Sequence, residues 1–278
     1  MNNTTDSTPN HPTAFLDRFS ESAVAETILD AYYQKFRRAL VSDVVIVGAG
    51  PSGLLAAWRL ADAGYRVVLL EKRLSPGGGI WGGSMGMNEI VVEKEACAIL
   101  AEAGVRYSPK GGLFSADAAE LASALCLKAI QAGAIFLNLI TAEDICAHDG
   151  RVTGVAANRS LLVNQLPIDP TVFSARAVID ATGHEAILVN CLYRRGLIEN
   201  TSGRMPGENV MDAPQGENFV VNQVTEVYPN LWITGMSVCA ALGGHRMGPI
   251  FGGMLLSGAQ VAEQVDRVLR KGGETGHD

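Results

Sequence analysis

Three glycines between two apolar segments constrain the fold of this chain more than any other feature. Gly48, Gly50 and Gly53 have the spacing G-x-G-x-x-G, directly after the apolar run 43–47 and at the start of a helical pattern over 53–63. In such a turn the first glycine permits a tight bend, the second lets the backbone approach a pyrophosphate, and the third lets helix and strand pack closely. The helix N-terminus then faces the anion. The pattern predicts a βαβ unit that binds a dinucleotide.

An acidic residue follows the second strand of this unit, which is predicted over 66–70. A carboxylate at Glu71 can accept hydrogen bonds from ribose hydroxyls and repels a 2′-phosphate, so it favours NAD or FAD over NADP. The glycine-rich segment 77–86 is either a flexible surface loop or a backbone cradle for the dinucleotide. We favour the cradle, with Trp81 covering the site.

Helical and strand-like patterns alternate along the rest of the chain. Helices are expected over 24–40, 94–103, 116–132 and 252–270, and strands over 105–107, 134–139, 151–157, 175–180 and 231–234. Ser20 or Ser22 is the expected N-cap of the first helix. The alternation predicts an α/β fold of the Rossmann type. Residues 1–20 are expected to form a disordered arm and residues 21–278 a single domain.

Composition excludes several classes of partner. The 29 acidic side chains exceed the 22 basic ones, and the net charge of −7 opposes contact with nucleic acid or an anionic membrane. No apolar run reaches the roughly 18 residues of a membrane span, and the polar N-terminus lacks the pattern of a secretory signal. The five cysteines form no C-x-x-C pair, which favours reduced thiols in the cytoplasm. A small-molecule partner is expected.

Five further motifs occur in order between residues 20 and 265. They are GGGIWGGSMG at 77–86, IDP at 168–170, DATGH at 180–184, TGM at 234–236 and HRMGPIFGGM at 245–254. Together they resemble the thiamine thiazole synthase family, most closely its archaeal and bacterial branch. The resemblance implies a Rossmann-type fold of the FAD-reductase-like kind with inserted β elements, and a ring-like homo-octamer.

The resemblance also implies that NAD is a substrate that is consumed. Nicotinamide leaves, the opened ADP-ribose isomerises to a ketone, glycine condenses as an imine, and sulfur enters before dehydration to an adenylated thiazole carboxylate. In flavoproteins that resemble this fold, a Gly-Asp pair comes directly after the strand that corresponds to 231–234, and its aspartate holds the ribityl chain of the flavin. This chain has Gly235 and Met236 at that place, so stable flavin binding is not expected. The residues assigned to dinucleotide binding are Gly48, Gly50, Gly53, Glu71, Lys72, Gly79, Met236 and Met247.

The resemblance assigns three catalytic residues, Asp169, His184 and Arg246. Asp169 and His184 match the iron ligands of the family, and a carboxylate with an imidazole leaves coordination positions open for Fe(II). Without the resemblance, Asp169 is a turn residue and His184 a histidine at a strand end. Arg246 matches the arginine that holds the glycine carboxylate, and its alternative is a surface loop arginine. Glu185 stands where the family commonly has aspartate.

The main departure from the family concerns sulfur. Two residues before Asp169, the single-turnover branch has a cysteine that gives up its sulfur, and the sulfide-using branch usually has histidine; this chain has Pro167. Cys239 is interpreted as a small buried thiol. Three hypotheses follow: an Fe(II)-requiring thiazole synthase that uses NAD, glycine and free sulfide; a diverged enzyme that opens NAD to another product; and a dinucleotide-binding protein without turnover.

Overall fold

The computed structural model describes residues 19–83, 85–163, 168–198 and 203–274. The chain divides into two compact units, residues 1–38 and residues 39–278. Most of the expected N-terminal arm and Pro167 lie outside the described residues, and the domain boundaries expected from the sequence stay predictions. Within the described ranges, no helix combines the length and the apolar composition needed to cross a membrane.

The first unit is the helix α1 (Glu21–Ala39), whose last residue already belongs to the second unit. It begins about one turn before the predicted start because Ser20 caps it: the Ala23 backbone N–H donates to Ser20 Oγ at 3.2 Å. Ser22, the other candidate cap, instead contacts the Ser20 hydroxyl at 2.9 Å. A side-chain acceptor at this place satisfies one of the free N–H groups of the first turn.

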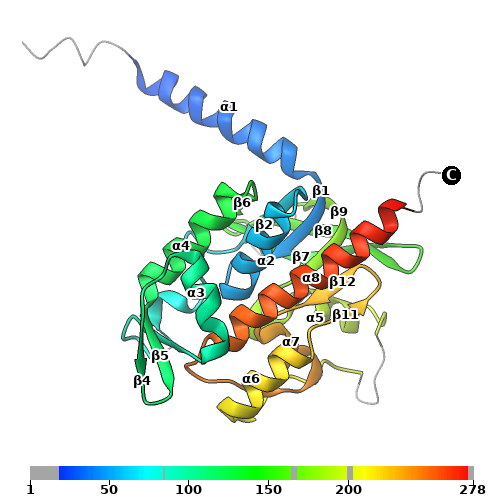
Figure 1. Cartoon of the computed structure of the whole chain (residues 1–278). Helices are drawn as coiled ribbons and strands as arrows, with labels where there is room; N and C mark the ends of the chain where they lie inside the picture. Colours follow the sequence, from blue (N-terminus) through cyan, green and yellow to red (C-terminus); the bar gives the residue numbers. More distant parts are fainter. Residues whose placement is uncertain (1–18, 84, 164–167, 199–202, 275–278) are drawn as a thin grey trace, which may run out of the picture. The chain divides into compact units, whose positions relative to one another are not determined.

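The second unit is built on a mainly parallel sheet (Figure 1). Its parallel strands lie in the order β12 (Leu231–Ile233), β9 (Thr171–Asp180), β1 (Val41–Val47), β2 (Val67–Glu71) and β6 (Ile135–Asn138), and β11 (Thr225–Tyr228) pairs antiparallel with β12. The central strands are apolar runs because a parallel sheet of this kind is covered on both faces. The predicted α/β fold of Rossmann type is confirmed.

The order of the strands creates a switch point beside β1. The chain builds outward from β1 through β2 to β6 and later returns to place β9 on the other side of β1. At the carboxyl end of β1, Val47 pairs with Leu70 of β2 and with Asp180 of β9. Ligands of open α/β sheets bind where the strand order reverses in this way.

Antiparallel β elements are inserted into this framework. A hairpin of β7 (Ile140–His148) and β8 (Arg151–Arg159) joins the sheet through the first part of β9. A separate three-stranded sheet has the order β3 (Glu89–Val92), β5 (Leu113–Asp117) and β4 (Tyr107–Lys110), and β10 (Asn209–Met211) pairs with β13 (His245–Arg246). These are the inserted β elements that the resemblance implies.

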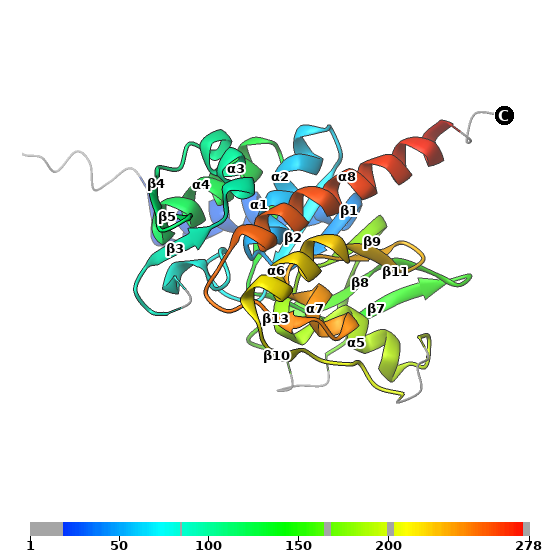
Figure 2. The same ribbon diagram turned by 60° about the horizontal axis from the view of Figure 1, so that its bottom comes forward.

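Helices cover the sheet. Figures 1 and 2 show α2 (Pro51–Asp62) and α8 (Gly252–Glu274) side by side on one face, with α4 (Ala118–Gln131) next to α2. The two long helices pack closely at Gly258, where a Cβ would lie 2.5 Å from the carbonyl oxygen of Ser52. The remaining helices are α3 (Cys97–Ala103), α5 (Ile187–Arg194), α6 (Ala213–Asn222) and α7 (Met236–Leu242), with 3-10 turns η2 (Ile80–Gly82), η3 (Lys94–Ala96) and η4 (Gly183–Glu185).

Two predicted elements have different boundaries. The strand predicted over 105–107 is wrong in its position, because β4 begins only at Tyr107, which pairs with Ala116, and Val105 is buried in the core before it. The helix predicted over 94–103 is divided into η3 and α3. The helix predicted from residue 116 starts at Ala118, after β5, because the Asp117 side chain caps it by accepting from the Glu120 N–H at 2.7 Å.

Two carboxyl groups meet at the start of α8. Glu217 of α6 is buried, and its Oε2 accepts from the backbone N–H of Gly253 at 2.5 Å. The carboxyl group of Glu93 lies against the same turn, since a Cβ on Gly252 would overlap its Oε2. Burial, with a contribution from Glu93, raises the pKa of Glu217 to about 8. Glu217 is therefore protonated at neutral pH.

This pair predicts a pH dependence of stability. Because the pKa of Glu217 in the folded chain lies above its ordinary value of 4.5, the folded chain keeps a proton that the unfolded chain releases. The contribution of Glu217 to the free energy of unfolding is fully present below pH 4.5 and decreases as the pH rises to about 8. Glu217→Gln, whose amide cannot ionise, should remove this decrease and raise the Tm relative to the parent at pH 8 to 9.

Calorimetry from about pH 5 to 9 measures this effect as a change in the slope of Tm against pH. The exposed Glu95→Gln, two residues from Glu93, is the matched control and should keep the parent slope. Parallel curves for the parent and Glu217→Gln would contradict the assignment.

Candidate active site

A cavity of about 720 Å³ opens at the carboxyl ends of β1, β2 and β9. This volume is typical of a site for a small molecule or cofactor. Its walls come from the glycine turn before α2, the segment after β2, the first residues of β7, the segment after β9, and the segment between β13 and α8. The cavity thus lies at the switch point of the sheet.

The three glycines of the turn are required for two different structural reasons. Gly48 has φ +103°, and a Cβ there would lie 2.3 Å from the carbonyl oxygen of Ala181, after β9. A Cβ on Gly53 would lie 2.0 Å from the carbonyl oxygen of Gly48. A Cβ on Gly50 would meet no atom within 4 Å, and Gly50 lines the cavity. Gly48 and Gly53 therefore permit packing, whereas Gly50 keeps space open in the cavity.

The N-terminus of α2 faces the same space. Gly50 is its N-cap and Pro51 its first residue, and no side chain caps the first turn. Pro51 and Ser52 line the cavity. The free N–H groups and the helix dipole make this end of the cavity favourable for a phosphate group.

The glycine-rich segment supplies backbone to the cavity wall. The Gly77 N–H donates to the Ala49 carbonyl at 2.6 Å, and Gly78 and Gly79 line the cavity. Trp81 does not line it, since its indole Nε1 donates to the carbonyl of Pro76 at 2.6 Å. The proposed covering role of Trp81 thus finds no support in the cavity lining.

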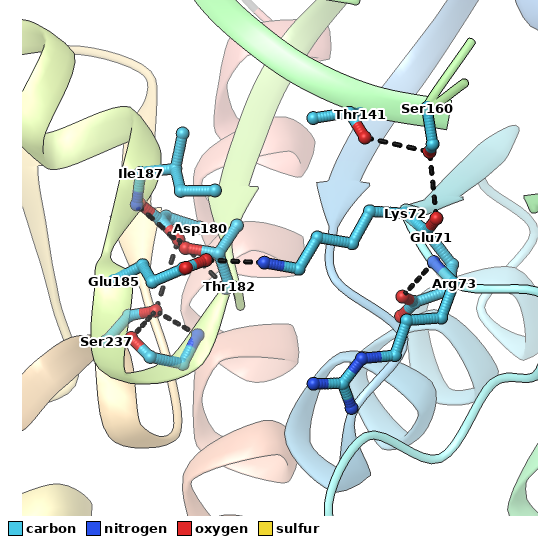
Figure 3. A network of polar contacts seen from close by, with 11 residues as sticks. Glu71, Lys72, Arg73, Thr141, Ser160, Asp180, Thr182, Glu185, Ile187 and Ser237 are labelled. Atoms are coloured by element: carbon cyan, nitrogen blue, oxygen red, sulfur yellow. Dashed lines mark hydrogen bonds and ion pairs between the residues drawn. The ribbon is translucent and has the colours of Figure 1, made fainter. Parts of the chain in front are cut away.

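Glu71 ties the glycine turn to the end of β2 (Figure 3). The carboxylate is buried; its Oε2 accepts from the Ala49 N–H at 2.9 Å, and its Oε1 accepts from the Arg73 N–H at 2.8 Å. The next side chain, Lys72, crosses to Glu185 with Nζ 2.6 Å from Oε2. These contacts fix the orientation of the Glu71 carboxylate and join the segments that follow β2 and β9.

Asp180, the last residue of β9, organises the segment after that strand. It is completely buried, and its carboxylate accepts five hydrogen bonds: from the Thr182 N–H (3.0 Å), the Thr182 hydroxyl (2.7 Å), the Ser237 hydroxyl (3.1 Å), and the Leu188 and Val189 N–H groups (2.8 and 3.2 Å). Burial raises the pKa of Asp180, and the hydrogen bonds oppose this effect. Asp180 thereby holds the turn 181–186 and the first turn of α5 in place (Figure 3).

His184 lies on this turn and lines the cavity. Its side chain is 56% exposed, and its Nδ1 lies 2.5 Å from Oε1 of Glu208, whose side chain is only 16% exposed. The turn closes through the Ala186 N–H, which donates to the Gly183 carbonyl at 3.0 Å. Ala186 has φ +36°, a strained value for a residue with a Cβ, and such strain is often found at functional sites.

Arg246 enters the cavity from β13. This strand pairs with β10, and the Asp212 N–H donates to the Arg246 carbonyl at 3.1 Å. The Arg246 side chain is exposed, and no hydrogen bond or ion pair engages its guanidinium within the part of the chain that the structure describes. His245 contacts the Val210 carbonyl through Nδ1 at 3.0 Å. The guanidinium of Arg246 is therefore available to an anion in the cavity.

The cavity brings together most of the residues singled out from the sequence. Its lining includes Gly48, Gly50, Glu71, Lys72, Gly79, His184, Met236 and Arg246. Gly53, Met247 and Asp169 are not in the lining: Gly53 serves packing, Met247 is buried against Gly216 of α6, and Asp169 is exposed just before β9. The dinucleotide-binding and catalytic assignments stay predictions.

A complete metal site is not formed by the described residues alone. Within them, no group of three or more histidine, cysteine, aspartate or glutamate side chains converges. His184 lines the cavity and Asp169 does not. The assignment of these two residues as metal ligands therefore also stays a prediction.

Sequence reasoning missed two residues that shape the site. Asp180 was noted only as part of a motif, although a carboxylate directly after an apolar strand and before Ala-Thr-Gly is a detectable signal. Glu208 lies in a connection with no motif of its own, 24 residues after His184. No local pattern could have paired it with His184.

The fold and the cavity define an α/β protein of the Rossmann-type dinucleotide-binding class. A model of the Thi4 family matches residues 25–251, and the chain belongs to this family. The thiamine thiazole synthase of Thermotoga maritima is 47% identical over 248 residues, which cover 89% of this chain and 97% of that protein. The thiamine thiazole synthase of Pyrococcus abyssi is 45% identical over 247 residues, which cover 88% and 96%. The resemblance inferred from the motifs is confirmed.

Solved structures agree with this placement. The crystal structure of Thermovibrio ammonificans THI4 matches with a TM-score of 0.86 at 43% identity, covering 91% of this chain and 100% of that chain. L-proline dehydrogenase from P. horikoshii, at 12% identity and a TM-score of 0.50, shares the fold alone. The similarity to the THI4 structure thus extends over nearly the whole chain.

The role of Asp180 predicts a large loss of stability on substitution. Asp180→Asn replaces one acceptor oxygen by an NH₂ group that faces N–H or O–H donors, so the free energy of unfolding should fall by about 2–4 kcal/mol. For a domain of this size the Tm should fall by roughly 5–15 °C in thermal unfolding. The exposed Asp62→Asn on α2 is the control and should change the Tm little. An unchanged Tm for Asp180→Asn would rule out this role.

Proposed function

We propose that this protein is a thiamine thiazole synthase that converts NAD, glycine and free sulfide to an adenylated thiazole carboxylate with Fe(II). The observation that carries the proposal is that one cavity unites a glycine turn typical of dinucleotide sites with an imidazole and with a guanidinium that has no partner among the described residues. The names of the relatives support the proposal, since they match nearly the whole chain.

The dinucleotide occupies the end of the cavity near β1 and β2. The N–H groups at the start of α2 hold the pyrophosphate, and Gly50 leaves room for it. The fixed carboxylate of Glu71 receives ribose hydroxyls through the lone pairs that its two backbone donors leave free. The adenylate half is thus anchored while the nicotinamide half reaches His184 and Arg246.

Glycine binds at the other end through its carboxylate. A guanidinium offers two parallel N–H donors that match the geometry of a carboxylate, and Arg246 has no described protein partner that competes for them. This contact orients the glycine amine toward the opened sugar.

The residues at this end are suited to a ferrous ion. The His184 imidazole is a ligand for Fe(II), and a carboxylate such as Asp169 completes a mixed nitrogen and oxygen set. When bound, Fe(II) supplies a Lewis acid that holds the nitrogen and sulfur reactants together. Because Asp169 does not line the cavity of its own chain, both ligands meet only if a second copy supplies Asp169 or the segment before β9 moves. A homo-oligomer, an octamer by family resemblance, is part of the proposal.

NAD is proposed as a substrate, and no flavin is expected to bind. After β12, Met236 lines the cavity where a flavoprotein of this fold carries an aspartate. A buried thioether cannot accept the hydrogen bonds of a ribityl chain as a carboxylate does.

Sulfur comes from solution in this proposal. Pro167 has no thiol to donate. Among the described cysteines, Cys239 of α7 is the one nearest in sequence to Met236, which lines the cavity. Burial raises the pKa of the Cys239 thiol to about 12, so it is not ionised at neutral pH and is a poor nucleophile. The five described cysteines are all free, which agrees with the proposed cytoplasmic location.

A second function is favoured by two departures from the family, Pro167 and Glu185. An enzyme that opens NAD in the same cavity and builds a different product would keep the glycine turn, Glu71 and Arg246. A third possibility is a dinucleotide-binding protein without turnover.

Product analysis separates these functions. Anaerobically purified protein is incubated with NAD, glycine, ³⁴S-labelled sulfide and Fe(II), and the products are identified by mass spectrometry. We expect free nicotinamide, several equivalents of labelled adenylated thiazole per chain, and no loss of about 34 Da from the protein, the H₂S that a donor cysteine would lose. Nicotinamide with another product would favour the diverged enzyme, and no reaction would favour a binding protein. An unlabelled thiazole with a mass loss at a cysteine would overturn sulfide use.

The glycine turn gives a paired prediction for nucleotide binding. A Cβ at position 50 meets no protein atom within 4 Å, so Gly50→Leu should keep a Tm near that of the parent, while its side chain in the cavity weakens NAD binding at least tenfold. Gly53→Ala overlaps the Gly48 carbonyl, so it should lower the Tm by several degrees. Thermal unfolding and calorimetric titration with NAD measure both effects. Undiminished NAD affinity in folded Gly50→Leu would count against this placement of the pyrophosphate.

A further inference from the structure

We infer that Glu208 is a positioning residue that fixes the tautomer and the orientation of His184, so that the Nε2 atom of the imidazole is presented to the cavity. The inference rests on the proposed function in one respect: Nε2 then serves as the metal-ligating atom of His184. Glu208 itself is not proposed to touch substrate or metal.

The contact between the two side chains selects one tautomer. The distance from His184 Nδ1 to Glu208 Oε1 is 2.5 Å. A carboxylate accepts and does not donate, so Nδ1 carries a proton in this contact, and in the neutral imidazole Nε2 then keeps its lone pair. The structure describes no protein partner for Nε2, and His184 lines the cavity. The lone pair of Nε2 is therefore available to a ligand.

Both side chains are held by the same helix. On the Glu208 side, the Gly207 N–H donates to the carbonyl of Ala240 in α7 at 2.9 Å, and the Asn209 N–H donates to the Gly244 carbonyl just after α7 at 2.9 Å. On the His184 side, the Gly183 N–H donates to the hydroxyl of Ser237 in α7 at 3.0 Å. The helix α7 thus sets the distance between the carboxylate and the imidazole.

The burial of Glu208 distinguishes this contact from an ordinary surface ion pair. An exposed pair contributes little to stability and requires no fixed geometry. Glu208 is only 16% exposed, and His184 is its one described side-chain hydrogen-bond partner. Removing a carboxylate from water is costly in free energy. Among the described side chains, only His184 offsets this cost with a hydrogen bond to Glu208, and the same contact orients the imidazole. A carboxylate behind an imidazole is the arrangement that orients histidine ligands in metal sites.

Metal titration of the whole, metal-free protein tests the consequence, with Co(II) as a spectroscopic probe for a ferrous site. Glu208→Ala should weaken Co(II) binding about 10–100-fold. Glu208→Gln, whose amide oxygen can still accept a hydrogen bond from Nδ1, should lose less Co(II) affinity than Glu208→Ala. Glu263→Gln, which removes an exposed carboxylate of α8 outside the cavity lining, is the control and should change the Kd less than about threefold.

Crystal structures of the metal-free parent and Glu208→Ala test the orientation directly. We expect one ordered His184 rotamer in the parent and a displaced or divided ring in the variant. A ring that keeps its rotamer in Glu208→Ala overturns the inference, even if metal affinity falls. A displaced ring with unchanged Co(II) affinity also overturns it, provided that His184→Ala abolishes binding in parallel.

Failure of the proposed function can be distinguished from failure of the inference about Glu208. If the parent does not bind Co(II), or binds it equally well as His184→Ala, the proposed metal site is wrong, whereas the crystal structures still decide whether Glu208 orients the ring. If Glu208→Ala does not fold, Glu208→Leu, which keeps the side-chain volume, replaces it in both measurements.

Discussion

The buried carboxylate of Asp180 is the interaction on which the active-site wall depends. It is the last residue of β9 and pairs with Val47 of β1, directly before the first glycine of the turn. Its five hydrogen bonds fix the turn that carries His184 and the first turn of α5. A carboxyl group in such a place is tolerated because both of its oxygens are hydrogen-bonded. The same residue therefore stabilises the fold and holds the turn that carries His184.

The helix α7 extends this control to the rest of the site. Ser237 joins the hydrogen bonds of Asp180 and also accepts from the Gly183 N–H, while the carbonyl of Ala240 holds the segment that carries Glu208. All but the last residue of this helix are buried, so it cannot shift without disturbing the core. The imidazole and its carboxylate partner are thus positioned by one rigid element, although they come from separate loops.

The sequence predicts those parts of the molecule whose causes are local. The glycine spacing, the apolar strands and the Ser20 cap depend on neighbouring residues, and the structure places them within a few positions of their predicted ranges. The start of β4 could not be predicted, because it depends on pairing with β5 rather than on its own pattern. Glu208 was missed for the same reason: its role depends on a contact with a residue far away in the chain. For catalytic assignments, the family motifs supplied what the pattern of single residues could not.

The cavity has two parts, and a single chain supplies all the expected binding groups of one part but not of the other. The dinucleotide part has its glycine turn, its uncapped helix N-terminus and its oriented carboxylate already in place, so binding there requires little reorganisation. The proposed metal part has an oriented imidazole, but Asp169 does not line the cavity. In the proposed function, one chain therefore has the dinucleotide end of the cavity already formed, whereas a metal centre of His184 and Asp169 requires a second copy or a movement of the segment before β9.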